Sequence, residues 1–209
     1  MEMGNIRHEA TNRDTALLIL FFLSGATALV YQVIWQKLLF TALGVDIHSV
    51  AIVVSTFMLG LGLGALFGGE FAERFPDQQI TFFIAVEICI GIFGLVSYDL
   101  LIAVATMAEN LSLFLTGAVN FVLLLFPTIL MGATLPVLVS HLYKMTRNVG
   151  LSIGNLYFSN TCGAALGSFF AGFILLNFFA YSETLLIAGA INLAVAGLAY
   201  QFIYREQYA

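Results

Sequence analysis

Glu87 is the one carboxylate that lies deep inside an apolar stretch of this 209-residue sequence. In the middle of a lipid bilayer a charged group costs at least about 2.5–3.5 kcal/mol, so such a group usually faces the interior of a helix bundle. Polar residues of a later stretch are expected at a similar depth, where they can hydrogen-bond this carboxyl or a ligand: Asn155, Tyr157 and Asn160. A protonatable acid at this place could couple to protons or bind an ammonium group. The alternative is a packing role, with Glu87 hydrogen-bonded between helices or reaching the near membrane surface.

A second candidate group lies on the first apolar stretch. Tyr31 and Trp35 are four residues apart and so share one face of a helix, with Gln32 beside them. These polar and aromatic side chains could line a cavity. Hydrogen bonds between helices together with an interfacial aromatic belt explain the same residues, and both interpretations stay open. Asn177 and Asn192 are interpreted as hydrogen-bonding residues between helices.

The histidines and cysteines predict no further chemistry. His48 and His141 are expected near opposite membrane faces, so they cannot share a metal ion, and no metal or cofactor site is predicted. Cys89 and Cys162 both lie inside apolar stretches, which gives no sign of a disulfide framework. No nucleophile is paired with a base at a spacing that would indicate an enzyme.

The composition places all these residues in a membrane. Apolar residues make up 61% of the sequence and charged residues 9%, against about 25% charged in soluble domains. The mean hydropathy is +1.00. Such a chain cannot supply the charged surface of a soluble fold, and it has no basic cluster that would indicate nucleic-acid binding. We therefore expect an integral membrane protein in contact with the lipid bilayer.

Six apolar stretches each reach the ~20 residues needed to cross ~30 Å of hydrocarbon. They cover residues 15–43, 49–70, 80–104, 112–142, 150–177 and 184–204. The predicted fold class is all-α, a polytopic bundle of about six transmembrane helices in one domain. Pro127 and Pro136 predict a bend in the fourth helix. We expect a cytoplasmic segment over residues 1–14, the transmembrane domain over 15–205 and a cytoplasmic tail over 206–209.

The positions of the basic residues predict the orientation of the bundle. Six of the seven Lys and Arg residues fall on one side of it: Arg7, Arg13, Arg74, Lys144, Arg147 and Arg205. The loops on the other side contain neither residue type. By the positive-inside rule, both termini are cytoplasmic. Lys37, near the outer end of the first helix, is expected to reach outward or to pair with an acidic loop residue.

The two halves of the chain resemble each other. Gly64 of the second stretch matches Gly167 of the fifth, and at the same offset Gly94 of the third matches Gly197 of the sixth. Three helices per copy force the second copy to be inverted in the membrane, so we expect two inverted three-helix repeats. The alternative is that small residues simply recur at close helix contacts. The second and fifth stretches do carry a small residue at every fourth position, and these are the predicted helix-packing residues: Gly60, Gly64, Gly68, Gly163, Gly167 and Ala171.

The turn after the second stretch resembles the cytoplasmic signature loop of the major facilitator superfamily. The matching glycine, small residue, acid and arginine are Gly69, Ala72, Glu73 and Arg74. Residues 76–78 stand where that family has a later glycine and basic residues, so gating by those basic residues is not expected. A helix end with one positive anchor is the simpler interpretation of the same residues.

Three longer segments resemble the membrane domain of bacterial membrane-bound spermidine-synthase-like proteins. They are residues 22–35, 127–136 and 154–167, in this order. Members of that family join a facilitator-like helical bundle to a cytoplasmic aminopropyltransferase-type domain. The sequence departs from the family pattern at Gln32, where Glu is usual, and at Lys37, where Arg is common.

The catalytic part of that family has no counterpart in this sequence. No glycine-rich nucleotide loop follows a predicted strand, because no strand is predicted. The resemblance therefore implies that any catalysis belongs to a separate polypeptide or has been lost, and we expect no enzyme.

Two functions remain open. The first is a carrier-like membrane module that is associated with a cytoplasmic aminopropyltransferase-type partner or moves a small metabolite, which could be a cation. The second is a structural subunit of a larger membrane complex without transport activity. In both cases we expect a homodimer or a hetero-oligomer in the bacterial inner membrane, because facilitator carriers bind substrate between two six-helix halves.

Overall fold

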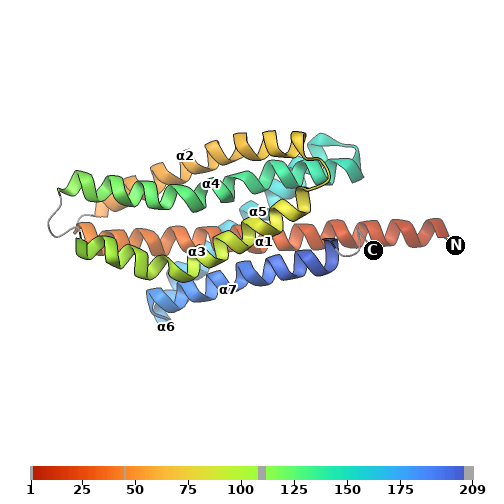
Figure 1. Cartoon of the computed structure of the whole chain (residues 1–209). Helices are drawn as coiled ribbons and strands as arrows, with labels where there is room; N and C mark the ends of the chain where they lie inside the picture. The colour runs from red at the N-terminus through yellow and green to blue at the C-terminus, as the bar shows by residue number, and fades with distance from the viewer. Residues whose placement is uncertain (1, 45, 108–111, 205–209) are drawn as a thin grey trace.

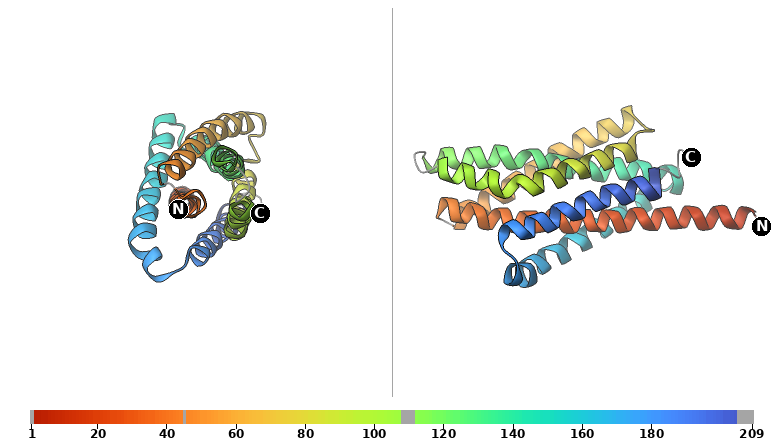
Figure 2. Two further views of the ribbon diagram at one scale, coloured as in Figure 1. Left: turned by 90° about the vertical axis from the view of Figure 1, so that its left-hand side faces the viewer. Right: turned by 60° about the horizontal axis from the view of Figure 1, so that its bottom comes forward.

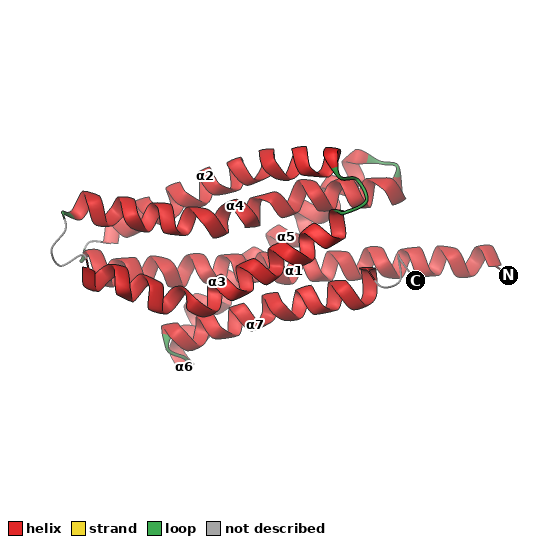
Figure 3. Ribbon diagram, in the orientation of Figure 1, coloured by secondary structure: helices red, strands yellow, loops and turns green. Residues whose placement is uncertain are grey.

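The computed structural model describes residues 2–44, 46–107 and 112–204, and it places most of them in helices (Figures 1 and 3). The six long helices are α1 (Glu2–Leu43), α2 (Asp46–Arg74), α3 (Gln79–Met107), α4 (Leu113–Thr146), α5 (Val149–Phe170) and α7 (Tyr181–Ala199). Three short segments extend them: the π-helical turn η2 (Ala171–Leu175), the single turn α6 (Leu176–Phe178) and the π-helical turn η3 (Tyr200–Tyr204). These ranges contain no strand.

Six helices are long and apolar enough to cross a bilayer. The spans are Asp14–Thr41, Ile47–Arg74, Gln79–Met107, Leu113–Thr146, Val149–Phe178 and Tyr181–Ile203. The prediction of an all-α fold with six such helices is confirmed. Helix α1 already begins at Glu2, so the polar segment before the first span is helical and projects beyond the bundle (Figure 1). The predicted tail at residues 206–209 lies outside the described ranges.

Polar residues at the helix ends explain where α4 and α5 begin. Ser112 precedes α4, and its Oγ accepts a hydrogen bond from the Leu115 N–H at 3.3 Å. Asn148 precedes α5, and its Oδ1 accepts from the Leu151 N–H at 3.0 Å. Both are preferred residue types at this position because they satisfy an N–H that has no partner within the helix. Arg147, with φ of 54°, turns the chain between α4 and α5.

Helix α1 lies in the middle of the bundle, enclosed by the other helices (Figure 2, left). Helix α5 packs against α1, α2 against α4 and α3 against α7. One apolar cluster surrounds the fully buried Trp35 of α1, and a second surrounds Phe83 of α3. Helix α4 continues through Pro127 and Pro136 as one element.

Glycines allow α5 to lie directly on α1. A side chain at Gly163 would collide with the carbonyl oxygen of Phe22, and one at Gly167 would collide with that of Ala26. The absence of a side chain therefore lets the two backbones meet, as is common between membrane helices.

Helices α2 and α4 approach each other in the same way. A side chain at Gly64 would meet the carbonyl oxygen of Ile129, and one at Gly68 would meet that of Ala133. Both contacts lie in the second half of α2.

The basic end of the bundle, as we call it, carries Arg74, Lys144 and Arg147, all exposed. The loop from Phe75 to Gln78 joins α2 to α3 at this end. Lys144 Nζ donates a hydrogen bond to the carbonyl oxygen of Pro76 and lies 3.8 Å from Asp77 Oδ1. The loop is thereby attached to the last turn of α4.

Candidate functional site

Glu87 lies at the junction of three helices and is fully buried. Its Oε1 accepts a hydrogen bond from Ser24 Oγ of α1 at 2.5 Å. Its Oε2 accepts one from Asn192 Nδ2 of α7 at 2.7 Å. The carboxylate of α3 therefore joins the first and the last membrane helix.

The hydrogen bonds continue through Tyr31. Tyr31 OH donates to Asn192 Oδ1 at 3.0 Å, so the amide of Asn192 is used at both its ends. The Tyr31 ring stacks on Trp35, with centroids 5.1 Å apart and planes 17° apart. Trp35 Nε1 in turn donates to Ser97 Oγ at 3.1 Å. We call Ser24, Glu87, Asn192 and Tyr31 the Glu87 network.

The Glu87 network is enclosed and internally satisfied. None of its members is more than 8% exposed, and each side-chain oxygen of Glu87 has a donor. A buried polar network of this kind fixes the helices that contribute to it, because breaking one bond leaves a polar group unpaired in apolar surroundings. In this conformation the arrangement joins α1, α3 and α7.

The polar residues of α5 lie away from this network. Helix α5 packs on the side of α1 that faces away from α3, so α1 separates them (Figure 2). Asn155 and Tyr157 are exposed. Asn160 is half-buried, and its backbone and side-chain oxygens lie against Gly25 of α1, where a side chain at that glycine would collide with them. The structure therefore does not bring these three residues to Glu87.

Gln32 lies apart from its sequence neighbours Tyr31 and Trp35. It lines a cavity of about 100 Å³ between α1, α2 and α5. Gln36 and Ser168 contribute further polar groups, and the rest of the wall is aliphatic. Residues that the sequence groups together thus face two different places, the buried network and this cavity.

Helix α5 carries two further polar side chains on the face that bears Ser168, outside the cavity wall. Tyr157, Thr161 and Ser168 are spaced four and seven residues apart, which places them on one helix face. We call them the polar stripe. A different face carries Phe158 of α5 and Phe173 of the adjoining turn η2, which are 70% and 68% exposed and suit contact with lipid. One helix therefore exposes two faces of different polarity.

Several residues of both places were not predicted from the sequence. Ser24 and Ser97 were not singled out, and Thr161 and Ser168 were not connected with Tyr157. The sequence of α1 did contain a signal: Ser24, Tyr31 and Trp35 are seven and four residues apart, so their hydrogen-bonding groups lie on one face of the helix.

The residues of the resembling signature loop lie at the end of α2. Glu73 and Arg74 are exposed at the basic end, and among the described residues no other helix lies within 4 Å of a Cβ added at Gly69. Among the described residues, no cluster of three or more His, Cys, Asp or Glu side chains could hold a metal ion.

Comparison with known proteins gives distant relatives over most of the chain. A polyamine aminopropyltransferase of Oceanobacillus iheyensis is 24% identical, with 90% of this chain and 36% of the relative covered. Enzymes of the same name from Corynebacterium efficiens and Mycobacterium tuberculosis H37Rv are 29% and 28% identical, over 86% and 95% of this chain and 34% and 38% of their own. No protein-family model matches the chain, and no solved structure matches it.

The chain spans about a third of the length of the curated relatives that it matches. The matches cover 86–95% of this chain, in which six apolar helices are long enough to cross a bilayer. The protein is a membrane helical module distantly related to the membrane portion of polyamine aminopropyltransferases.

Proposed function

We propose that this chain is a carrier-like membrane module that binds or moves a small cationic metabolite of the polyamine class beside a cytoplasmic aminopropyltransferase-type domain. One observation carries the proposal: amide and hydroxyl groups of α1 and α5 reach a partly open face inside otherwise apolar spans. Polar groups in lipid are costly unless a cavity, water or a partner satisfies them. The distant relationship to polyamine aminopropyltransferases supports the choice of metabolite.

The chemistry of this face suits an ammonium group. An alkylammonium has three donors and no acceptor, and the amide oxygen of Gln32 and the hydroxyls of Thr161 and Ser168 are acceptors. The exposed ring of Tyr157 adds a cation–π surface, worth about 0.5–1 kcal/mol at such a site. Several weak acceptors without a fixed carboxylate favour a metabolite that binds and then leaves.

The proposal includes two inverted three-helix repeats, α1–α3 and α4–α7. Reciprocal contacts support this arrangement: a side chain at Gly91 would meet the carbonyl oxygen of Gly189 at 3.1 Å, and one at Gly189 would meet that of Gly91 at 2.9 Å. Each glycine also faces a leucine of the partner helix, Leu193 or Leu95. Helices α3 and α7 thus contact each other through corresponding residues.

The glycine contacts of α2 and α5 support the same repeats in a shifted register. A side chain at Gly64 of α2 would meet a carbonyl oxygen of α4, and one at Gly163 of α5 would meet a carbonyl oxygen of α1 in the same way. Gly68 and Gly167, each one turn later, form a second corresponding pair. The sequence pattern instead matches Gly64 with Gly167. The proposed structural register therefore differs from the sequence match by one helical turn.

The remaining parts of the proposal concern the membrane and the partner. Helix α1 begins, and η3 ends, at the basic end of the bundle (Figure 1), and the positive-inside rule makes this end cytoplasmic in a bacterial inner membrane. A single six-helix unit offers one wall of a transport route. A second copy or another six-helix unit would supply the opposite wall.

Uptake of labelled spermidine into proteoliposomes tests this function. We expect saturable uptake above that of empty liposomes and its loss in Gln32→Leu, which replaces the cavity amide by an apolar group of similar size. Asn177→Leu is the matched control, since Asn177 Nδ2 of α6 donates to the carbonyl oxygen of Phe173 in the adjoining turn η2 and the residue is not part of the cavity wall. Equal uptake by Gln32→Leu and wild type would contradict the proposal.

A structural subunit of a larger membrane complex is the second candidate. The enclosure of the Glu87 network favours it, because the fully buried carboxylate of Glu87 is used to hold helices together. Under this alternative, spermidine uptake equals that of empty liposomes. The protein purified from its own membrane would then retain a stoichiometric subunit.

A further inference from the structure

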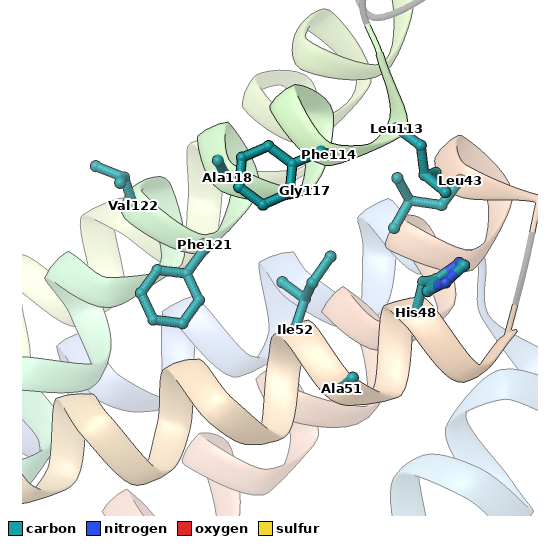
Figure 4. Close-up of a pocket in the computed structure, with 10 residues that line it drawn as sticks. All are labelled: Leu43, His48, Ala51, Ile52, Leu113, Phe114, Gly117, Ala118, Phe121 and Val122. Atoms are coloured by element: carbon teal, nitrogen blue, oxygen red, sulfur yellow. The ribbon is translucent and has the colours of Figure 1, made fainter.

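A groove lies between α2 and α4 at the end of the bundle opposite the basic end (Figure 4). Its volume is about 520 Å³, and Leu43 at the end of α1 contributes to its wall. The α4 side extends from Leu113 to Val122. The groove does not touch the cavity beside Gln32, which lies between α1, α2 and α5.

The groove ends where α2 and α4 come together. Farther along the two helices, a side chain at Gly60 would collide with Thr128, so no space remains between them there. From Leu113 to Val122 the groove is about 14 Å long at 1.5 Å per residue. This is about half of the ~30 Å hydrocarbon thickness, so the length of the groove matches the depth of one leaflet and is too short to cross the bilayer.

The lining of the groove is ordered by polarity along its length. The single polar side chain, His48, is exposed and lies at the end near Leu43 and Leu113, whereas Ile52 and Phe121 line the deeper part (Figure 4). Gly117 keeps the floor open, because a side chain there would come within 3.1 Å of Ile52 Cδ1. The groove is therefore polar at its end beside His48 and apolar along the rest of its length, in the same order as the headgroup and the acyl chain of a lipid.

We propose that this groove binds one acyl chain of a membrane phospholipid, with the ester and headgroup region beside His48. The length of one leaflet, the closed inner end and the polar mouth together match a single lipid chain. A transmembrane helix of another protein would run the full depth of the bilayer, and the groove stops halfway. An unfilled apolar groove of this size would lose van der Waals contacts along its whole lining, so the surrounding lipid is the natural occupant.

Photolabelling tests the proposal. The protein is reconstituted in nanodiscs that contain phosphatidylcholine with a diazirine in the middle of one acyl chain, and the labelled residues are mapped by mass spectrometry. We expect label to concentrate on Ile52 and on residues 113–122. Gly117→Leu should lower this labelling several-fold, because the new side chain fills the floor. Gly62→Leu is the matched control, since no other described helix lies within 4 Å of a Cβ added there.

Three results would overturn the lipid site. One is labelling at the groove no stronger than on the exposed face around Phe158 and Phe173. Another is groove labelling that Gly117→Leu leaves unchanged. The third is an absence of lipid label from Ile52 and residues 113–122, which would mean that protein and not lipid covers the groove. If Gly117→Leu does not fold, Ala118→Phe blocks the groove from its exposed rim and gives the same comparison.

Discussion

The side-chain amide of Asn192 donates a hydrogen bond to the carboxylate of Glu87 over 2.7 Å and so connects α7 to α3. The oxygen of the same amide accepts a hydrogen bond from the hydroxyl of Tyr31 in α1 at 3.0 Å. Asn192 therefore links two residues, Glu87 and Tyr31, that lie 105 and 161 positions away from it in the sequence. The stability of the bundle should depend on this link.

Substitutions at Glu87 should separate hydrogen bonding from charge. Glu87→Gln keeps an acceptor for Asn192 and places a donor against the Ser24 hydroxyl, so the free energy of unfolding should stay within about 1 kcal/mol of the wild type. Glu87→Leu removes the acceptor of the Ser24 hydroxyl and of Asn192 Nδ2 and should cost about 1–3 kcal/mol. Steric-trapping measurements in bicelles compare the two. Spermidine uptake that depends on pH in the wild type but not in Glu87→Gln would instead assign Glu87 a proton-coupling role.

Tyr31→Phe should lower stability modestly without changing the aromatic stack. The substitution removes the bond to Asn192 and retains the ring against Trp35. Hydrogen bonds between membrane helices average about 0.6 kcal/mol, with a maximum near 1.7. Tyr157→Phe is the control, because Tyr157 is 60% exposed and outside the network. An equal loss of thermal stability in both variants would argue against the bond to Asn192.

Gly64→Leu should prevent the normal packing of α2 on α4. The new side chain would meet the Ile129 carbonyl oxygen and the Ala133 nitrogen, which are backbone atoms and cannot move aside. Gly62→Leu, two residues away, enters open space and should behave like the wild type. Size-exclusion chromatography in detergent measures the fraction of folded protein. A normal elution profile for Gly64→Leu would refute the close approach of the two helices.

The contact of Lys144 with the α2–α3 loop should depend on the loop carbonyl rather than on the ion pair. The side chain of Asp77 is 91% exposed, so its pair with Lys144 is screened by water and contributes little. Asp77→Asn should leave the melting temperature unchanged. Lys144→Met removes the donor to Pro76 and should increase hydrogen exchange of residues 75–78. The reverse order of effects would show that the charge pair holds the loop.

The fold was predictable because lipid leaves few solutions for an apolar chain of this length. Every backbone polar group must be satisfied inside the membrane, so six apolar stretches have to become six helices. The helix ends were less exact, since helices continue past the hydrocarbon region, as α1 does from Glu2. Periodicity along one helix also placed Tyr31 and Trp35 on a common face, where they stack.

The partners of Glu87 could not be predicted in this way. Depth in the membrane can be read from the sequence, and it placed Asn160 and Asn192 among the candidates for contacts between helices. Which helices are neighbours depends on packing, and α1 stands between α3 and α5. Asn192 of α7 therefore reaches Glu87, whereas Asn160 covers Gly25.

Cysteine accessibility along α5 tests most directly whether the polar stripe borders a water-filled route for a cation. Cys89 and Cys162 are first replaced by alanine, and single cysteines are then placed at Tyr157, Thr161 and Ser168, or at Phe158, Phe169 and Phe173. A charged, water-soluble thiol reagent should modify the first set and not the second, and spermidine should slow the modification. Equal protection of both sets would mean that lipid or protein covers the whole of α5, and it would contradict the proposed carrier-like function.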